Sequence, residues 1–422
     1  MKSVYLQKSF LFLWLAQAAS GLGGTFATFI ISWLVYDLSG SKIAMGMIWI
    51  SFMVPSLLTN LLAGPYIDRF SYKKMMIFSE WLRAITFIII GGLLLTNQLP
   101  LIVLFIAAMV AGIAEPLFRP ASMAYVASIL PKENLQRGNS LLEGTMQTMM
   151  LIGPALGGLL LSVFGPSLVI FILTFAITFA GILLLFVKNT EQLQSKEKTP
   201  WLPMFKEGIN FFKMYPVLFW IGILMMIINF SSGAAQPMFL PYVLEHLQGT
   251  EFQYGLFMSL FSCGMVFGSL ITGFFKQPKN LRFVMLGSLT LGGVCLVFLG
   301  LVTNIWVALV ISMAQGIFAV MFTINNTTFY QKRVPEKIRG RVFTVRALLA
   351  QSGIPIGAGL GGVLAEVYSF SFLFVTLGGL TILATVIAWS SKIFYQLNVP
   401  LVEGAVLTDD NLGDGVLHKE AT

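Results

Sequence analysis

An acidic and a basic residue stand four positions apart in an otherwise apolar stretch of the chain. Glu115 and Arg119 lie within residues 100–127, and Pro116 and Pro120 follow them directly. Positions i and i+4 share a helix face, and glutamate before a cation is the favourable order. Each proline frees the carbonyl four residues earlier, so we expect a kink beside the charges. Two interpretations are open: an ion pair that stabilises the kink, or a carboxylate that alternates between Arg119, a proton and a cationic substrate.

This stretch is one of twelve apolar runs in the sequence that are long enough to cross a bilayer, for which about 20 residues suffice. Of the 422 residues, 57% are hydrophobic and only 10% are charged, too few polar groups to cover a water-soluble globule. Cys263 and Cys295 lie inside apolar runs, so we expect no disulfide framework. The composition predicts an all-α membrane protein with twelve transmembrane helices.

Basic residues are distributed unevenly between the two sides of the predicted membrane. If the amino terminus is inside, all of the 26 Lys and Arg residues except Lys42 and Arg119 lie in or beside inner segments. This asymmetry predicts a multi-pass protein of the plasma membrane with both termini in the cytoplasm. The net charge of +8 then reflects topology and contact with anionic membrane lipids, and not nucleic-acid binding.

The sequence repeats itself with an offset of 204 residues, which superimposes Pro131 on Pro335 and Arg137 on Arg341. The same offset relates two runs rich in small residues. The run in the first half contains Gly153, Pro154, Gly157 and Gly158, and the run in the second half contains Gly357, Gly361 and Gly362. Small residues allow membrane helices to pack closely, so we expect helix-packing and hinge positions here. Six apolar runs in each repeat predict two pseudo-symmetric six-helix bundles.

The predicted domain boundaries follow from the repeat and from the polar segments. We expect an amino-terminal bundle over 1–187, a cytoplasmic linker with an interfacial amphipathic helix over 188–214, and a carboxy-terminal bundle over 215–391. The cytoplasmic tail, 392–422, has an acidic, glycine-containing composition that favours disorder. All outer connections are short, so we expect a monomer without an outer partner-binding domain.

The first inner loop carries the motif Gly64-Pro-Tyr-Ile-Asp68-Arg69, followed by Lys73 and Lys74. This motif resembles the Gly-x-x-x-Asp-Arg loop of major facilitator superfamily transporters, and Gly153-Pro154 with Gly157-Gly158 resembles the motif of the superfamily's antiporters. The resemblance covers essentially the whole chain and implies the major facilitator fold. It points to the drug and macrolide exporter branch, whose members are proton antiporters.

The resemblance also implies roles for individual residues. Asp68 is expected to face the helix that carries Arg341 and Arg346, forming an inner-gate latch that closes when the transporter is open to the outside. Glu143 joins Glu115 and Arg119 as a proton-coupling candidate, with an ion pair at the inner gate as its alternative. Glu80 and Arg83 are expected to form an interfacial pair.

In this fold the first, fourth, seventh and tenth helices are expected to line the central cavity, and polar groups at matching places in both halves fit a substrate site there. The cavity-lining candidates are Gln17, Thr25, Thr28, Asn229, Ser232, Gln236, Gln315, Asn325 and Asn326.

Taken together, these features predict a secondary transporter that exports an amphipathic small molecule in exchange for protons. An importer or a lipid or metabolite transporter of the same fold is the alternative. An enzyme is disfavoured, because the two histidines, His246 and His418, lie in a loop and in the tail, and no metal or phosphate-binding motif is present. We expect neither a metal nor a cofactor.

Overall fold

The computed structural model describes residues 8–67, 71–189, 201–274, 278, 280–335 and 338–398. In these ranges the chain forms helices and connections, with no residue in a β-strand. Twelve helical segments are long and apolar enough to cross a membrane. The predicted all-α membrane fold is therefore confirmed.

The first half contains six long helices. They are α1 (Lys8–Ser39), α2 (Lys42–Ile67), α3 (Tyr72–Leu95), α4 (Leu101–Ile129), α5 (Lys132–Phe164) and α6 (Pro166–Leu185). The linker helix α7 (Trp201–Met214) follows, over the stretch predicted to be an amphipathic helix.

The second half contains six spans in more pieces. They are formed by α8 (Pro216–Ala235), η2 (Gln236–Met238), α9 (Phe239–Pro241), η3 (Tyr242–His246), α10 (Glu251–Phe274), α11 (Leu281–Leu301), α12 (Ile305–Arg333), α13 (Arg339–Gln351), α14 (Gly353–Val367) and α15 (Phe370–Ser390). Proline explains both interruptions. Pro237 and Pro241 lie where α8 gives way to η2, α9 and η3, and Pro355 has no N–H to donate to the carbonyl of Gln351, where α13 ends.

The start of the tail differs from its prediction. Residues Lys392–Asn398 form a 3₁₀ helix, η5, in which Phe394 and Leu397 are buried. The prediction of a disordered tail was wrong for this segment, because these two apolar side chains join the core of the second half. The remainder of the predicted tail, 399–422, lies outside the described residues.

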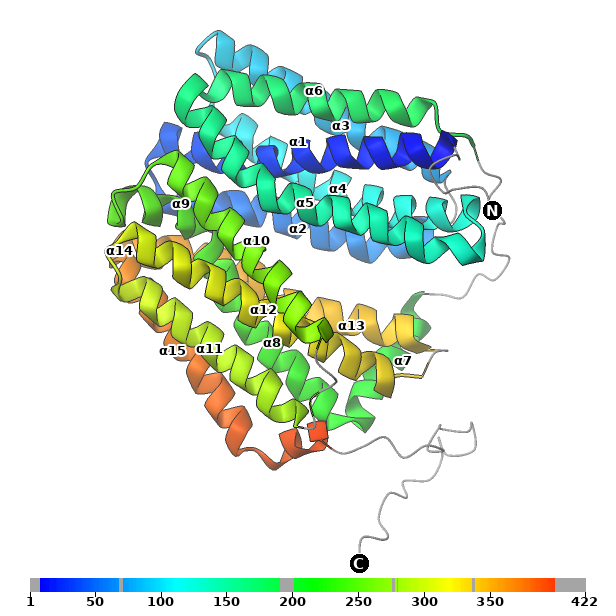
Figure 1. Cartoon of the computed structure of the whole chain (residues 1–422), viewed down its shortest axis with the longest axis vertical. Helices are drawn as coiled ribbons and strands as arrows, with labels where there is room; N and C mark the ends of the chain where they lie inside the picture. Colours follow the sequence, from blue (N-terminus) through cyan, green and yellow to red (C-terminus); the bar gives the residue numbers. More distant parts are fainter. Residues whose placement is uncertain are drawn as a thin grey trace, which may run out of the picture.

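The two halves repeat one packing scheme, as Figure 1 shows for the groups α1–α6 and α8–α15. In the first half α2 packs on α4, and α3 packs on α4 and α6. In the second half α10 packs on α12, and α11 packs on α12 and α15. Between the halves, α2 packs on α14 and α5 packs on α10, which are equivalent pairs under the repeat.

The halves meet at one end of the molecule. We call it the loop end, because it contains the connections at residues 40–41, 165, 247–250 and 368–369. The opposite, terminal end contains Lys8 and residues 130–131. In Figure 1 the helices of the two groups converge toward α9 and α14 at the loop end.

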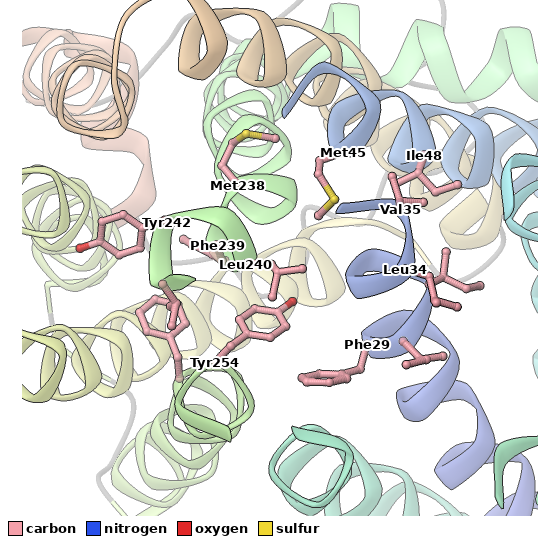
Figure 2. Close-up of a cluster of buried hydrophobic side chains, with 14 of the residues drawn as sticks. Phe29, Leu34, Val35, Met45, Ile48, Met238, Phe239, Leu240, Tyr242 and Tyr254 are labelled. Atoms are coloured by element: carbon pink, nitrogen blue, oxygen red, sulfur yellow. The ribbon is translucent and has the colours of Figure 1, made fainter. Parts of the chain in front are cut away.

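The hydrophobic cores divide in the same way. One core at the loop end combines residues of both halves. In Figure 2, Phe29, Leu34 and Met45 of the first half face Leu240 and Tyr254 of the second. At the terminal end each half has a separate core. Apolar burial therefore joins the halves at the loop end only.

Candidate functional site: the interface between the halves

Four glycines bring the backbones of the two halves into contact at the loop end. We call Gly46, Gly158, Gly255 and Gly362 the glycine seam. A Cβ atom at Gly158 would lie 2.5 Å from the carbonyl oxygen of Glu251, and one at Gly362 would lie 2.6 Å from that of Lys42. At Gly46 and Gly255 a Cβ would also meet a backbone carbonyl of the other half. No larger residue fits this interface as it stands.

The other glycines among the predicted packing positions face helices of their own half. A Cβ at Gly153 would meet Thr25 of α1, and Gly157 lies over Phe29. Gly357 and Gly361 pack in the same way against the backbone of α8. Pro154 contributes the carbonyl that Gly255 approaches. Each glycine-rich run thus holds its helix against its own half with two glycines and against the opposite half with a third.

A cluster of polar groups lies beside the seam. We call Tyr36, Lys42, Glu245 and Glu366 the loop-end ionic cluster. Lys42 Nζ lies 2.9 Å from Glu245 Oε2, the Tyr36 hydroxyl donates to Glu245, and the Lys42 backbone N–H donates to Glu366 Oε2 at 3.0 Å. Lys42 also lies over the ring of Phe370, 4.6 Å from its centroid. The cluster joins three parts of the chain that are distant in sequence, residues 36–42, Glu245 and Glu366. The sequence pattern alone did not predict it.

Two adjoining cavities lie on the terminal side of the seam. One, of about 340 Å³, is lined by Leu57 and Asn60 of α2 and by residues of α13, including Thr344 and Gln351. The other, of about 210 Å³, is lined by Met225, Asn229, Phe343, Arg346, Ala347, Ala350 and Gln351. Phe343, Ala347 and Gln351 line both. The two cavities together form a mixed polar and apolar space against α13.

Among the described residues, Arg346 is the only charged one that lines either cavity. Its guanidinium donates to Thr327 Oγ1 at 3.5 Å and lies over the rings of Tyr330 and Phe343, at 4.4 and 5.2 Å from their centroids. No carboxylate of the described residues forms an ion pair with it. Two aromatic faces and one hydroxyl group therefore surround this guanidinium where a carboxylate would usually lie.

Of the predicted cavity-lining residues, only Asn229 lines one of these cavities. Its amide donates to the Ala350 carbonyl at 2.8 Å. Several others bond within their own half. Gln17 donates to the Leu142 carbonyl, Thr25 and Thr28 donate to carbonyls of α1, Asn325 donates to Met321, and Asn326 contacts the sulfur of Met225. Ser232, Gln236 and Gln315 are half-buried and do not border either cavity.

Of the two interpretations of Glu115 and Arg119, the structure does not contain the ion pair between them. Arg119 Nη2 instead lies 3.3 Å from Glu143 Oε2 of α5, and Glu143 Oε1 accepts a bond from Gln147 at 3.0 Å. Glu115 is exposed and has no ion pair with a described residue. The arginine reaches across to the neighbouring helix because α4 and α5 pack together, which spacing along one helix does not reveal.

Glu80 and Arg83 form an ion pair that is buried in the protein. Arg83 Nη1 lies 3.2 Å from Glu80 Oε1, and the Ser20 hydroxyl of α1 donates to the same oxygen at 2.9 Å. The Glu80 side chain is 0% exposed and that of Arg83 is 12% exposed. The charges therefore lie between α1 and α3, shielded from the surface of the protein.

The predicted inner-gate residues are only partly described. Asp68 and Arg69 lie outside the described residues, and Gly64 lies in a part of α2 whose side chains are not described. Lys73 donates to the Leu185 carbonyl at 2.7 Å, and Lys74 is exposed. Arg341 forms an ion pair with Glu207 of α7.

Comparisons with known proteins agree with this architecture. Residues 3–412 match the family described as transmembrane secretion effector. The chain is 26% identical to the transporter YfiS of Bacillus subtilis, over 92% of this chain and 94% of the relative. It is 21% identical to macrolide efflux protein A of Streptococcus pyogenes, over 89% and 94%.

A solved structure shares the fold at low sequence identity. It is a bacterial homologue of the iron transporter ferroportin in an inward-facing state, with a TM-score of 0.73 and 17% identity. The alignment covers 94% of this chain and all of that one.

Proposed function

Because the chain belongs to the transmembrane secretion effector family, a group of major facilitator transporters and not of enzymes, we propose that it is a secondary active exporter. It moves an amphipathic small molecule out of the cell in exchange for protons. The cargo class is suggested by macrolide efflux protein A, to which this chain is similar over most of its length. The exporter acts as a monomer in the plasma membrane.

The observation that carries the proposal is the asymmetry between the two ends. The halves share a core, a glycine seam and an ionic cluster at the loop end, and have separate cores at the terminal end. If the two halves rock about the cavities, the loop end opens and the terminal end closes. This movement is alternating access between two repeats.

The distribution of basic residues gives this movement a direction. With the terminal end in the cytoplasm, the structure has its outer side closed and its cavities on the cytoplasmic side of the seam. An apolar cargo would enter there, against Met225 and Phe343. In the opposite state the Asp68 latch forms with Arg341 or Arg346, and the loop-end ionic cluster separates.

Glu115 is proposed to bind a cationic group of the cargo. It is an exposed carboxylate without an ion-pair partner among the described residues, on a helix with two internal prolines. A charged group inside a span is costly unless it has a function or a partner. Arg119 and Glu143 neutralise each other beside it.

Transport by the purified protein in proteoliposomes tests the proposal. Erythromycin, as a macrolide, and ethidium, as an amphipathic cation, are the probes. An imposed pH gradient should drive at least one probe against its concentration gradient, and a protonophore should abolish this transport. Vesicles without protein are the control. If the pH gradient changes the transport of neither probe, proton antiport is refuted.

A further inference from the structure

Glu80 is a buried acid in the interior of the first half. It follows the start of α3 at Tyr72 by eight residues, or about 12 Å of helix rise. The whole helix is about 36 Å long, slightly longer than a bilayer core of about 30 Å. The carboxyl group therefore lies well inside the apolar layer.

The carboxyl group has an uneven set of partners. Oε1 accepts bonds from both Ser20 and Arg83, whereas Oε2 has no hydrogen-bond partner. The Ser20 hydroxyl also accepts from Arg83 Nη1 at 3.1 Å, so the three groups form a closed triangle between α1 and α3. A buried carboxylate oxygen without a partner costs free energy, which a bound proton would reduce.

Within the part of the chain that the structure describes, no other charge faces this triangle. The helices packed on α3 are α4 and α6, and α1 contacts α3 through Ser20. α6 has no charged residue. In α1 the ionisable residues are Lys8, Tyr36 and Asp37, all near its two ends. On α4, Glu115 is exposed and Arg119 pairs with Glu143. Of the charged groups among the described residues, Arg83 alone opposes protonation of Glu80, and the hydrogen bond from Ser20 acts in the same direction.

Arg83 connects the acid to the helix that is expected to line the cavity. A Cβ at Gly24 of α1 would lie 3.3 Å from Arg83 Nη2, so the absence of a side chain there leaves room for the guanidinium. If Glu80 binds a proton, Arg83 loses its counter-charge, and the ion pair no longer holds it between the helices. The α1–α3 link then weakens, and α1 carries Tyr36 of the loop-end ionic cluster.

We propose that Glu80 is the proton-binding residue of the transporter, and that Ser20 and Arg83 position it. The inference rests on the proposed antiport. In the outward-open state a proton binds Glu80 Oε2, giving a neutral acid and an unpaired Arg83. After the return to the described arrangement the proton leaves to the cytoplasm, and the carboxylate pairs again with Arg83. One proton crosses per cycle, and no other reactant is needed.

Conformation, measured without any cargo, gives a direct test. Spin labels at Leu38→Cys and Val367→Cys, both exposed near the loop end in opposite halves, report its opening. Since the Glu80–Arg83 pair belongs to the closed loop end, acidification from about pH 8 to about pH 5 should increase the long-distance population in the wild type. Glu80→Gln should show a high, pH-independent population. Asp37→Asn, which neutralises an exposed carboxylate on α1, should behave like the wild type.

The double variant Glu80→Gln, Arg83→Gln shows whether the pH response is lost because Glu80 cannot bind a proton or because Arg83 is left unpaired. It leaves no unpaired charge, so it should fold even where Glu80→Gln is unstable. A proton-binding role predicts that the pH response is still absent. Recovery of the response in the double variant, or its persistence in Glu80→Gln, would refute the proposal, as would a wild type that does not respond to pH.

Transport measurements then test proton antiport and the role of Glu80 separately. Glu80→Gln should lose transport of erythromycin or ethidium driven by a pH gradient, and retain exchange between equal probe concentrations. A wild type that lacks proton-driven transport contradicts the proposed function. Proton-driven transport that survives in Glu80→Gln contradicts only the role of Glu80.

Discussion

Substitution at the glycine seam should change which end of the transporter is open. Gly158→Ala places a methyl group 2.5 Å from the Glu251 carbonyl oxygen, and Gly362→Ala places one 2.6 Å from that of Lys42. An ordinary contact begins at 3.4 Å, so the helices must separate by about 0.9 Å and 0.8 Å. Overpacking of this kind costs roughly 1–3 kcal/mol.

The cost applies only while the loop end is closed. Each substitution should therefore shift the equilibrium toward the open loop end by a factor of about 5 to about 150, at 1.4 kcal/mol per tenfold change. The two substitutions act on different helix pairs, α5 with α10 and α2 with α14, so we expect larger shifts when they are combined.

The assay is the distance distribution between spin labels at Leu38→Cys and Val367→Cys, in a protein whose Cys263 and Cys295 have been replaced. Gly92→Ala is the matched control, because a Cβ there meets nothing within 4 Å and the change in helix propensity is the same. Distributions for Gly158→Ala and Gly362→Ala that coincide with the control would refute the close-packing argument.

Three further predictions concern the charged groups. Lys42→Met removes the ion pair with Glu245, which is partly exposed. We expect about a two- to fivefold shift of the equilibrium toward the open loop end, measured with the same spin labels, and a smaller shift at high salt. Glu115→Gln should weaken ethidium export while the pH response of the labels remains, and unchanged export would exclude a cargo contact. Asp68→Asn should lower transport, and a double-mutant cycle with Arg341→Gln should be non-additive if the latch exists; additive losses would count against contact.

The architecture was predictable because its signals are local and repeated. Apolar runs of sufficient length predicted twelve spans, and the match of Gly153 to Gly357 and of Gly158 to Gly362 predicted two equivalent halves. The breaks after Gln351 and near Pro237 follow from proline chemistry. Each of these inferences requires only the residues of one segment and the physics of a helix in a bilayer.

The partners of the charges were not predictable in the same way. Arg119 has one carboxylate on its own helix and another on α5, and only the packing of α4 on α5 decides between them. Glu80 and Arg83 were expected to form an interfacial pair, and the pair forms, but the other partner of Glu80, Ser20, comes from α1. Helix rotation and contacts between distant segments determine both outcomes.

The separate cores at the terminal end have a consequence for how the protein assembles. The first half has a complete core around Phe10 and Tyr125, and the second has one around Phe211 and Tyr330, so neither needs the other to bury these side chains. The shared core needs both. Two separately synthesised fragments, divided within the linker, should each insert into the membrane and then associate through their loop ends. The covalent link would then be dispensable for assembly, and the shared core would act as a subunit interface within a single chain.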